Sequence, residues 1–215
     1  HCISSAASDV YKRQYEDLIY YQSFDRAWLH EVLTSQPLSQ VLALDWHYQI
    51  RVIQPAISYD FLVGWTKEPA ISSDLIRQIK GAIKEDFLKE SQTAVKNLEK
   101  GLREGNQKGI KTSIERADQN LKALNPLIYT PALKELQQAT DGLSACAKSS
   151  GAGGGDCGVA LSFDPLETQT LIERWTEKKI EIIYQERIGD SWAKIEKTNI
   201  CLLYTSPSPR DRSLS

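Results

Sequence analysis

The segment from residue 148 to residue 158, with the sequence KSSGAGGGDCG, has the residue types best suited to binding a ligand. We call the following residues the glycine loop: Ser149, Ser150, Gly151, Ala152, Gly153, Gly154, Gly155 and Asp156. Glycine lets the backbone approach a bound molecule closely, and successive backbone N–H groups form an anion-binding concavity. The serines and the acid add polar groups suited to an anionic, hydroxylated ligand.

Two familiar phosphate-binding motifs do not match this loop. It lacks the Gly-Lys-Ser/Thr ending of a Walker A motif, and we expect it to follow a helix and enter a strand, which is the reverse of the Walker and dinucleotide-binding order. A glycine-rich run can also be a flexible linker, and residue chemistry alone leaves that alternative open. The shortness of the loop between two predicted core elements favours a binding role.

Three residues around Trp65 and one acid of the loop are further candidates. Lys67 can steer an anionic substrate or be a solvated lysine at a strand end. Ser72 and Ser73 stand where a helix is predicted to begin, and they can support anion binding at its N-terminus or simply cap it. Asp156 can cap the loop or contribute to a magnesium or hydroxyl site; capping is favoured, because an acid beside phosphates repels them without a metal.

Both ends of the chain resemble the translation of one sequencing adapter. A single oligonucleotide, read from its two strands, encodes the residues 9–14 (DVYKRQ) and the residues 201–206 (CLLYTS). The sequence also contains no methionine. We therefore expect residues 1–14 and 201–215 to be adapter-derived and disordered, and we exclude them from fold reasoning.

Composition limits the classes of function. Leaving out the two adapter segments removes four basic and two acidic residues, which changes the formal charge from −2 to −4. This mild acidity argues against a nucleic-acid partner, and no apolar run is long enough to span a membrane. Cys146 and Cys157 have no CxxC spacing, which fits a reducing, cytoplasmic location. His30 and His47 lack partners at metal-ligand spacing, so we expect no metal-binding residues in this chain.

Apolar periodicity predicts an alternation of strands and helices. We expect strands at residues 18–24, 47–53, 59–65, 157–163 and 180–184, with the second and third adjacent through a turn at 54–58. We expect helices at residues 25–33, 72–102, 110–124, 131–147 and 165–175. Helices grouped between strands favour an α+β fold with helices on one face of a mainly antiparallel sheet.

The residues of the glycine loop also resemble a known motif. KSSGAGGGDCG at 148–158 is similar to the third conserved motif of the GHMP small-molecule kinases, and its GAGGGDCG form is similar to that of the phosphomevalonate kinases. Three other segments agree in order: residues 21–26 (YQSFDR), 60–73 (DFLVGWTKEPAISS) and 184–189 (YQERIG). The set is more specific than any one motif.

This resemblance implies an ATP-dependent phosphoryl transfer to 5-phosphomevalonate, with Mg²⁺ as cofactor. It implies a ferredoxin-like C-terminal domain at residues 56–190, preceded at 15–55 by a remnant of the N-terminal domain. The ATP-binding loop and the catalytic groups of the family are then expected upstream of this chain. Another GHMP enzyme, such as mevalonate kinase or diphosphomevalonate decarboxylase, and a non-catalytic helical binding module remain alternatives. The sequence does not indicate an oligomeric state.

Overall fold

The computed structural model describes residues 18–68, 82–150 and 154–189. The adapter-like segments 1–14 and 201–215 lie outside these ranges. A small antiparallel sheet joins β1 (Ile19–Gln22) to β2 (Gln49–Val52). The main antiparallel sheet has the order β4-β5-β3-β6, formed by β3 (Tyr59–Trp65), β4 (Ala145–Ser149), β5 (Cys157–Ser162) and β6 (Glu181–Ile188).

Most helices begin where the sequence places capping residues. The side chains of Asp25, Thr130 and Asp164 accept hydrogen bonds from backbone N–H groups in the first turn of the helix that follows each of them. Proline follows Thr130 and Asp164 at a position that needs no hydrogen bond. The helices are α2 (Arg26–Ser35), α3 (Leu38–Val41), α5 (Glu85–Glu104), α6 (Gln107–Leu124), α7 (Pro131–Gln138) and α8 (Pro165–Glu177), with a short 3₁₀ turn η1 (Pro126–Ile128).

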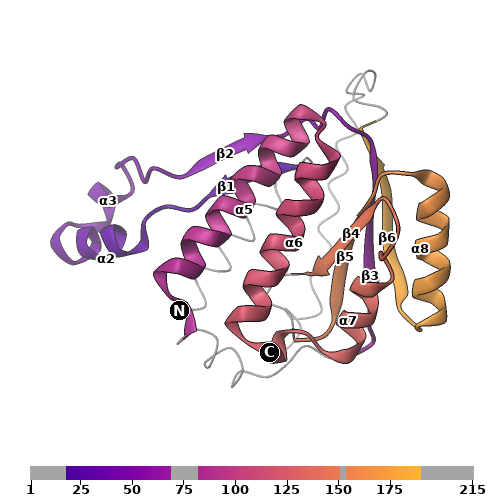
Figure 1. The fold of residues 1–215 in the computed structure, drawn as a ribbon. Helices are drawn as coiled ribbons and strands as arrows, with labels where there is room; N and C mark the ends of the chain where they lie inside the picture. The colour runs from indigo at the N-terminus through magenta and orange to yellow at the C-terminus, as the bar shows by residue number, and fades with distance from the viewer. Residues whose placement is uncertain (1–17, 69–81, 151–153, 190–215) are drawn as a thin grey trace, which may run out of the picture.

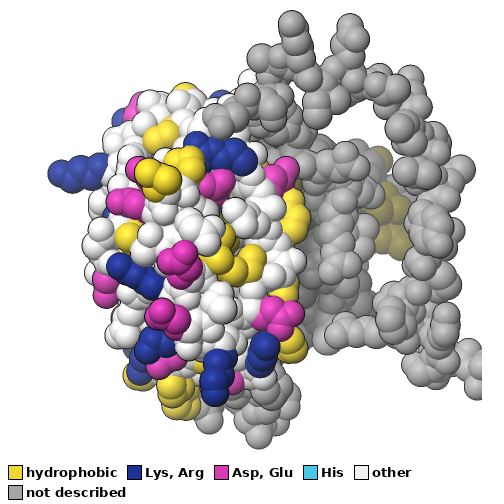
Figure 2. All heavy atoms as spheres, turned by 90° about the vertical axis from the view of Figure 1, so that its right-hand side faces the viewer, with side chains coloured by type: hydrophobic (Ala, Val, Ile, Leu, Met, Phe, Trp, Pro, Cys, Tyr) yellow, Lys and Arg dark blue, Asp and Glu magenta, His cyan; other side chains and the backbone are white. Residues whose placement is uncertain are grey.

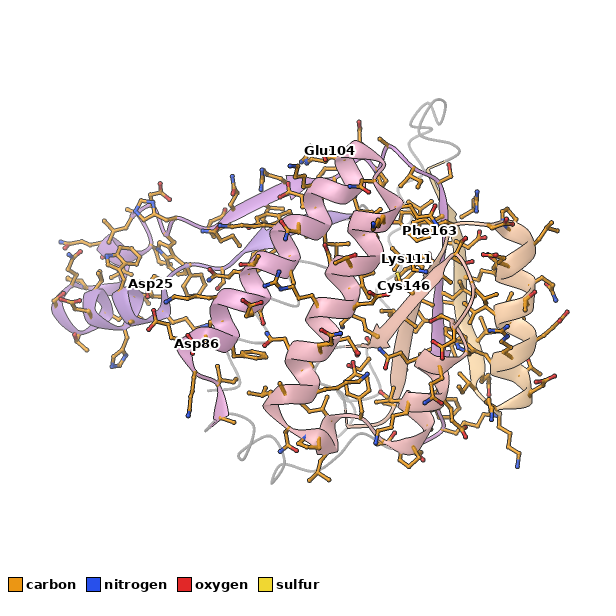
Figure 3. The ribbon with its side chains drawn as sticks, in the orientation of Figure 1. Asp25, Asp86, Glu104, Lys111, Cys146 and Phe163 are labelled. Atoms are coloured by element: carbon orange, nitrogen blue, oxygen red, sulfur yellow. The ribbon has the colours of Figure 1, made fainter. Side chains whose placement is uncertain are left out.

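Helices cover both faces of the main sheet (Figure 1). On one face α7 and α8 pack on small strand residues, and the fully buried Trp175 belongs to that cluster. On the other face α5 and α6 pack on Tyr59, Cys146 and Leu161. Lys111 of α6 lies beside Cys146 (Figure 3), and its Nζ donates to the Leu143 carbonyl at 2.9 Å.

The α+β class with an antiparallel sheet is confirmed, but helices on one face alone were a wrong expectation. The order strand–helix–strand–strand–helix–strand, with α7 and α8 on a shared face, is the ferredoxin-like part. The α5–α6 hairpin is added on the opposite face. The strands allow this because successive residues alternate between the two clusters, as Cys146 and Ala147 do.

The predicted helix at 131–147 is also wrong in its second half. Helix α7 ends at Gln138, and the chain then turns through Gly142, at φ 76°, into strand β4. The glycine loop therefore joins two antiparallel strands and does not follow a helix. The residues at 143 and 147 match a helical period by chance, because β4 is short and rich in small residues that favour no particular structure.

The strand at 49–52 does not pair with the strand at 59–65, contrary to the sequence prediction. β2 pairs with β1, and the neighbours of β3 are β5 and β6. The turn at 54–58 thus leads from one sheet into the other. The proposed division between residues 15–55 and 56–190 remains a prediction.

The face that bears α8 carries acidic and basic side chains side by side (Figure 2). Lys, Arg, Asp and Glu are interspersed there, and no basic stripe crosses it. Within the described ranges, no helix combines the length and the apolar character needed to cross a membrane.

Candidate functional site

The described part of the glycine loop has a backbone that glycine alone adopts readily. Gly154 and Gly155 are buried and have φ angles of 89° and 117°, and Asp156 follows in the left-handed region at φ 66°. A side chain at Gly155 would be strained at that φ angle. These two glycines therefore fix the path of the backbone just before β5.

The loop is hydrogen-bonded to the turn that follows β3. The backbone N–H and Oγ1 of Thr66 donate to the Asp156 carbonyl at 2.7 and 2.9 Å, and the Asp156 N–H donates to the Glu68 carbonyl at 2.8 Å. Lys67, with φ 63°, is the middle residue of this turn. The structure therefore brings two of the predicted site residues, Lys67 and Asp156, together.

Lys67 is paired rather than free. Its Nζ lies 3.0 Å from Oε2 of Glu181 at the start of β6, and both side chains are about half exposed. Such an exposed pair contributes little to stability and exchanges readily with solvent. Lys67 can therefore turn to an anionic ligand at small cost.

The side chain of Asp156 is exposed and lies near the thiol of Cys157. Burial, followed by the nearby Asp156 charge, raises the pKa of Cys157. Among the described residues no backbone N–H donates to this carboxylate, so the backbone of Asp156, and not its side chain, ties down the loop. In the same part of the chain, no group of three or more His, Cys, Asp or Glu is placed to hold a metal ion.

The two serines of the loop point in different directions. Ser149 is 1% exposed, and both its N–H and its Oγ donate to the Tyr129 hydroxyl, at 3.3 and 3.2 Å. Ser150 is exposed, and its N–H donates to the Cys157 carbonyl at 2.9 Å. Of the two hydroxyls, Ser150 is available to a ligand, whereas Ser149 is used inside the protein.

Lys148 immediately precedes the loop in the chain. Its side chain is largely buried, and its amino group donates to the Ser149 carbonyl. Burial lowers the pKa of Lys148, and the negative charge of Asp118 opposes that shift. Asp118 and Tyr129 were not predicted from the sequence, although one signal was present: Asp118 interrupts the apolar stripe of α6 between Ile114 and Leu121.

The other predicted site residues cannot be placed. Ser72, Ser73, Gly151, Ala152 and Gly153 lie outside the described residues. Their assignment to a phosphate site therefore stays a prediction.

Comparison with known proteins gives relatives over most of the chain, although no family model matches it. A phosphomevalonate kinase from Streptomyces sp. (strain CL190) is 30% identical over 154 residues, 66% of this chain and 41% of that protein. The solved structure of Streptococcus pneumoniae phosphomevalonate kinase in complex with phosphomevalonate and AMPPNP is 48% identical. The match covers 80% of this chain and 53% of the S. pneumoniae chain, with a TM-score of 0.75.

A more distant structure extends the likeness of fold. Mevalonate kinase from L. major is 16% identical, with a TM-score of 0.55 over 65% of this chain and 44% of that one. The chain spans about half the length of the relatives it matches. The resemblance to the GHMP kinases, and among them to phosphomevalonate kinase, is confirmed.

Proposed function

We propose that this chain is the C-terminal part of a phosphomevalonate kinase. The complete protein transfers the γ-phosphate of ATP to (R)-5-phosphomevalonate, giving 5-diphosphomevalonate and ADP, in the mevalonate route to isoprenoids. The names of the relatives support this reaction, and the S. pneumoniae enzyme has been solved with phosphomevalonate and AMPPNP.

The observation that carries the proposal is the geometry of the glycine loop. Its backbone is held by hydrogen bonds to the 66–68 turn, beside Lys67. Phosphoryl transfer depends on positioning and on neutralising charge more than on covalent chemistry by the protein. A fixed backbone that phosphates can approach closely, with the exposed Ser150 and a half-exposed lysine beside it, suits that task.

The described residues fit a bound nucleotide better than they fit a metal ion alone. Gly154, Gly155 and Ser150 offer close backbone approach and a hydroxyl group to phosphate oxygens. Mg²⁺ would supply charge neutralisation on the phosphates, and the single exposed acid of the loop, Asp156, does not form a metal site without other ligands. We therefore expect the metal ligands and the catalytic groups in the part of the enzyme that precedes this chain.

We also propose a cytoplasmic location. Cys146 and Cys157, the described cysteines, are both free thiols. Free thiols fit a reducing compartment.

The test is an assay of the complete parent protein with ATP, Mg²⁺ and each of two acceptors, 5-phosphomevalonate and mevalonate. We expect ADP formation that depends on 5-phosphomevalonate, with no turnover by the 215-residue chain alone. Turnover of mevalonate in its place would instead assign the parent to the mevalonate kinases. Inactivity with both acceptors, in a folded protein that binds ATP, would overturn the proposal.

A further inference from the structure

Residues near both ends of the glycine loop hydrogen-bond to one short segment, residues 128–129. At the first end, the Ser149 N–H and Oγ donate to the Tyr129 hydroxyl. At the second end, the Gly154 N–H donates to the Ile128 carbonyl at 2.7 Å. Two neighbouring residues, Ile128 and Tyr129, therefore hydrogen-bond to the loop, and neither was predicted from the sequence to do so.

The hydrogen-bonding capacity of the Tyr129 hydroxyl determines its third partner. A phenol has one proton to donate and two lone pairs to accept with. Since Ser149 supplies two donors, the phenol proton is directed elsewhere, and the Asp118 carboxylate is the neighbouring acceptor toward which it is drawn. Burial, together with this carboxylate, raises the pKa of Tyr129. The hydroxyl therefore stays protonated and keeps this direction of donation.

Asp118 is itself fixed and almost wholly buried. Its side chain is 3% exposed, and Oδ2 lies 2.7 Å from Nζ of Lys122, one helical turn further along α6. The Lys122 ammonium also stands 4.8 Å from the centre of the Tyr129 ring. Oδ1 is buried and has no hydrogen-bond partner among the described residues. A buried carboxylate oxygen in this state attracts a nearby donor, and the proton of the Tyr129 hydroxyl is the one available.

We propose that Asp118 and Tyr129 are positioning residues that hold both ends of the glycine loop in the geometry required for binding phosphates. A binding loop needs such support, because a site that is present but loosely held loses most of its effect. The buried carboxylate orients the phenol, and the phenol orients Ser149. The Ile128 carbonyl, next to it in the chain, orients Gly154. The link to catalysis rests on the proposed function, whereas the link to loop geometry does not.

The first experiment needs no enzymatic activity. Amide hydrogen exchange is followed by NMR in the ¹⁵N-labelled 215-residue chain for wild type, Tyr129→Phe, Asp118→Asn and Tyr59→Phe. Tyr59→Phe is the matched control, because it removes another buried phenol oxygen far along the sheet. We expect Tyr129→Phe to speed exchange of the Ser149 and Gly154 amides about 10-fold, and Asp118→Asn to do so less. Wild-type exchange at both amides in these variants would overturn the proposal.

The second experiment asks whether the support serves the reaction. In the complete parent protein we expect Tyr129→Phe to lower kcat/KM for 5-phosphomevalonate about 10-fold, and Tyr59→Phe to leave it unchanged at a similar melting temperature. If Tyr129→Phe does not fold, Asp118→Asn is judged by the same two measurements. Faster loop exchange with unchanged kinetics would overturn the positioning role, whereas an inactive wild type would count against the proposed function alone.

Discussion

The segment 149–162, which consists of the glycine loop and strand β5, has two halves that use glycine for different physical reasons. In the loop, Gly154 and Gly155 adopt positive φ angles that other residues avoid. In strand β5, Gly158 has an ordinary extended backbone, but an added Cβ would lie 2.6 Å from Cδ2 of Leu136 on α7. One short segment therefore contains a proposed binding element and a packing element, which mutation can separate.

The packing half is tested by Gly158→Ala, for which we expect the largest loss of stability. The new methyl group would collide with the fully buried Leu136, and overpacking of this kind costs about 1–3 kcal/mol. Gly64→Ala should behave similarly, because its Cβ would meet Ile180 and Trp175 across the same face. Urea unfolding of the chain measures both. Surface substitutions typically change the free energy of unfolding by less than about 0.5 kcal/mol. A change that small in either variant would contradict the packing explanation.

Asp156 lies where the two halves meet, and we expect its substitution to lower stability by less. Its φ angle of 66° is tolerated by Asn but not by a β-branched residue. Asp156→Val should therefore lose about 1–2 kcal/mol of stability, while Asp156→Asn keeps the wild-type value. Thermal unfolding of the two variants side by side makes the comparison. Equal melting temperatures would show that the left-handed backbone at this position is not a constraint.

The smallest expected change in stability is that of Lys67→Ala. Its exposed pair with Glu181 contributes about 0–1 kcal/mol, so the melting temperature should hardly change. If Lys67 steers the substrate, KM for 5-phosphomevalonate in the parent protein should rise several-fold with kcat nearly constant. Glu181→Gln is the control, since it breaks the same pair but keeps the lysine. An unchanged KM in Lys67→Ala would show that the lysine does not steer the substrate and is an ordinary solvated surface residue.

Local signals in the sequence predicted the elements that local chemistry determines. Asp25, Thr130 and Asp164 stand at or just before the start of three predicted helices, and each accepts hydrogen bonds from backbone N–H groups of the first turn. Trp175 is the last apolar residue of the predicted helix at 165–175 and is fully buried. Such features depend on a few neighbouring residues and need no knowledge of the tertiary fold.

Features that depend on distant partners were not predictable in the same way. Strand β4 consists of Ala-Cys-Ala-Lys-Ser, which has little strand preference, and it is a strand because β5 pairs with it and α6 covers it. The partner of β2 is β1, which is separated from it by two helices. Likewise, the Asp118–Tyr129–Ser149 connection joins a helix, a turn and a strand, so no single stretch of sequence contains it.

The proposed function requires the loop half of the segment 149–162 to serve phosphate transfer through its backbone. The most direct measurement compares kcat/KM of the complete parent protein for wild type, Gly154→Val and Gly142→Val. Gly142 also has a positive φ angle, at the opposite end of β4, and open space around its Cα, so it carries the same strain outside the site. We predict a loss of about 100-fold for Gly154→Val, from misplaced reacting groups, and near wild-type activity for Gly142→Val. Equal activities in the two variants would contradict the account.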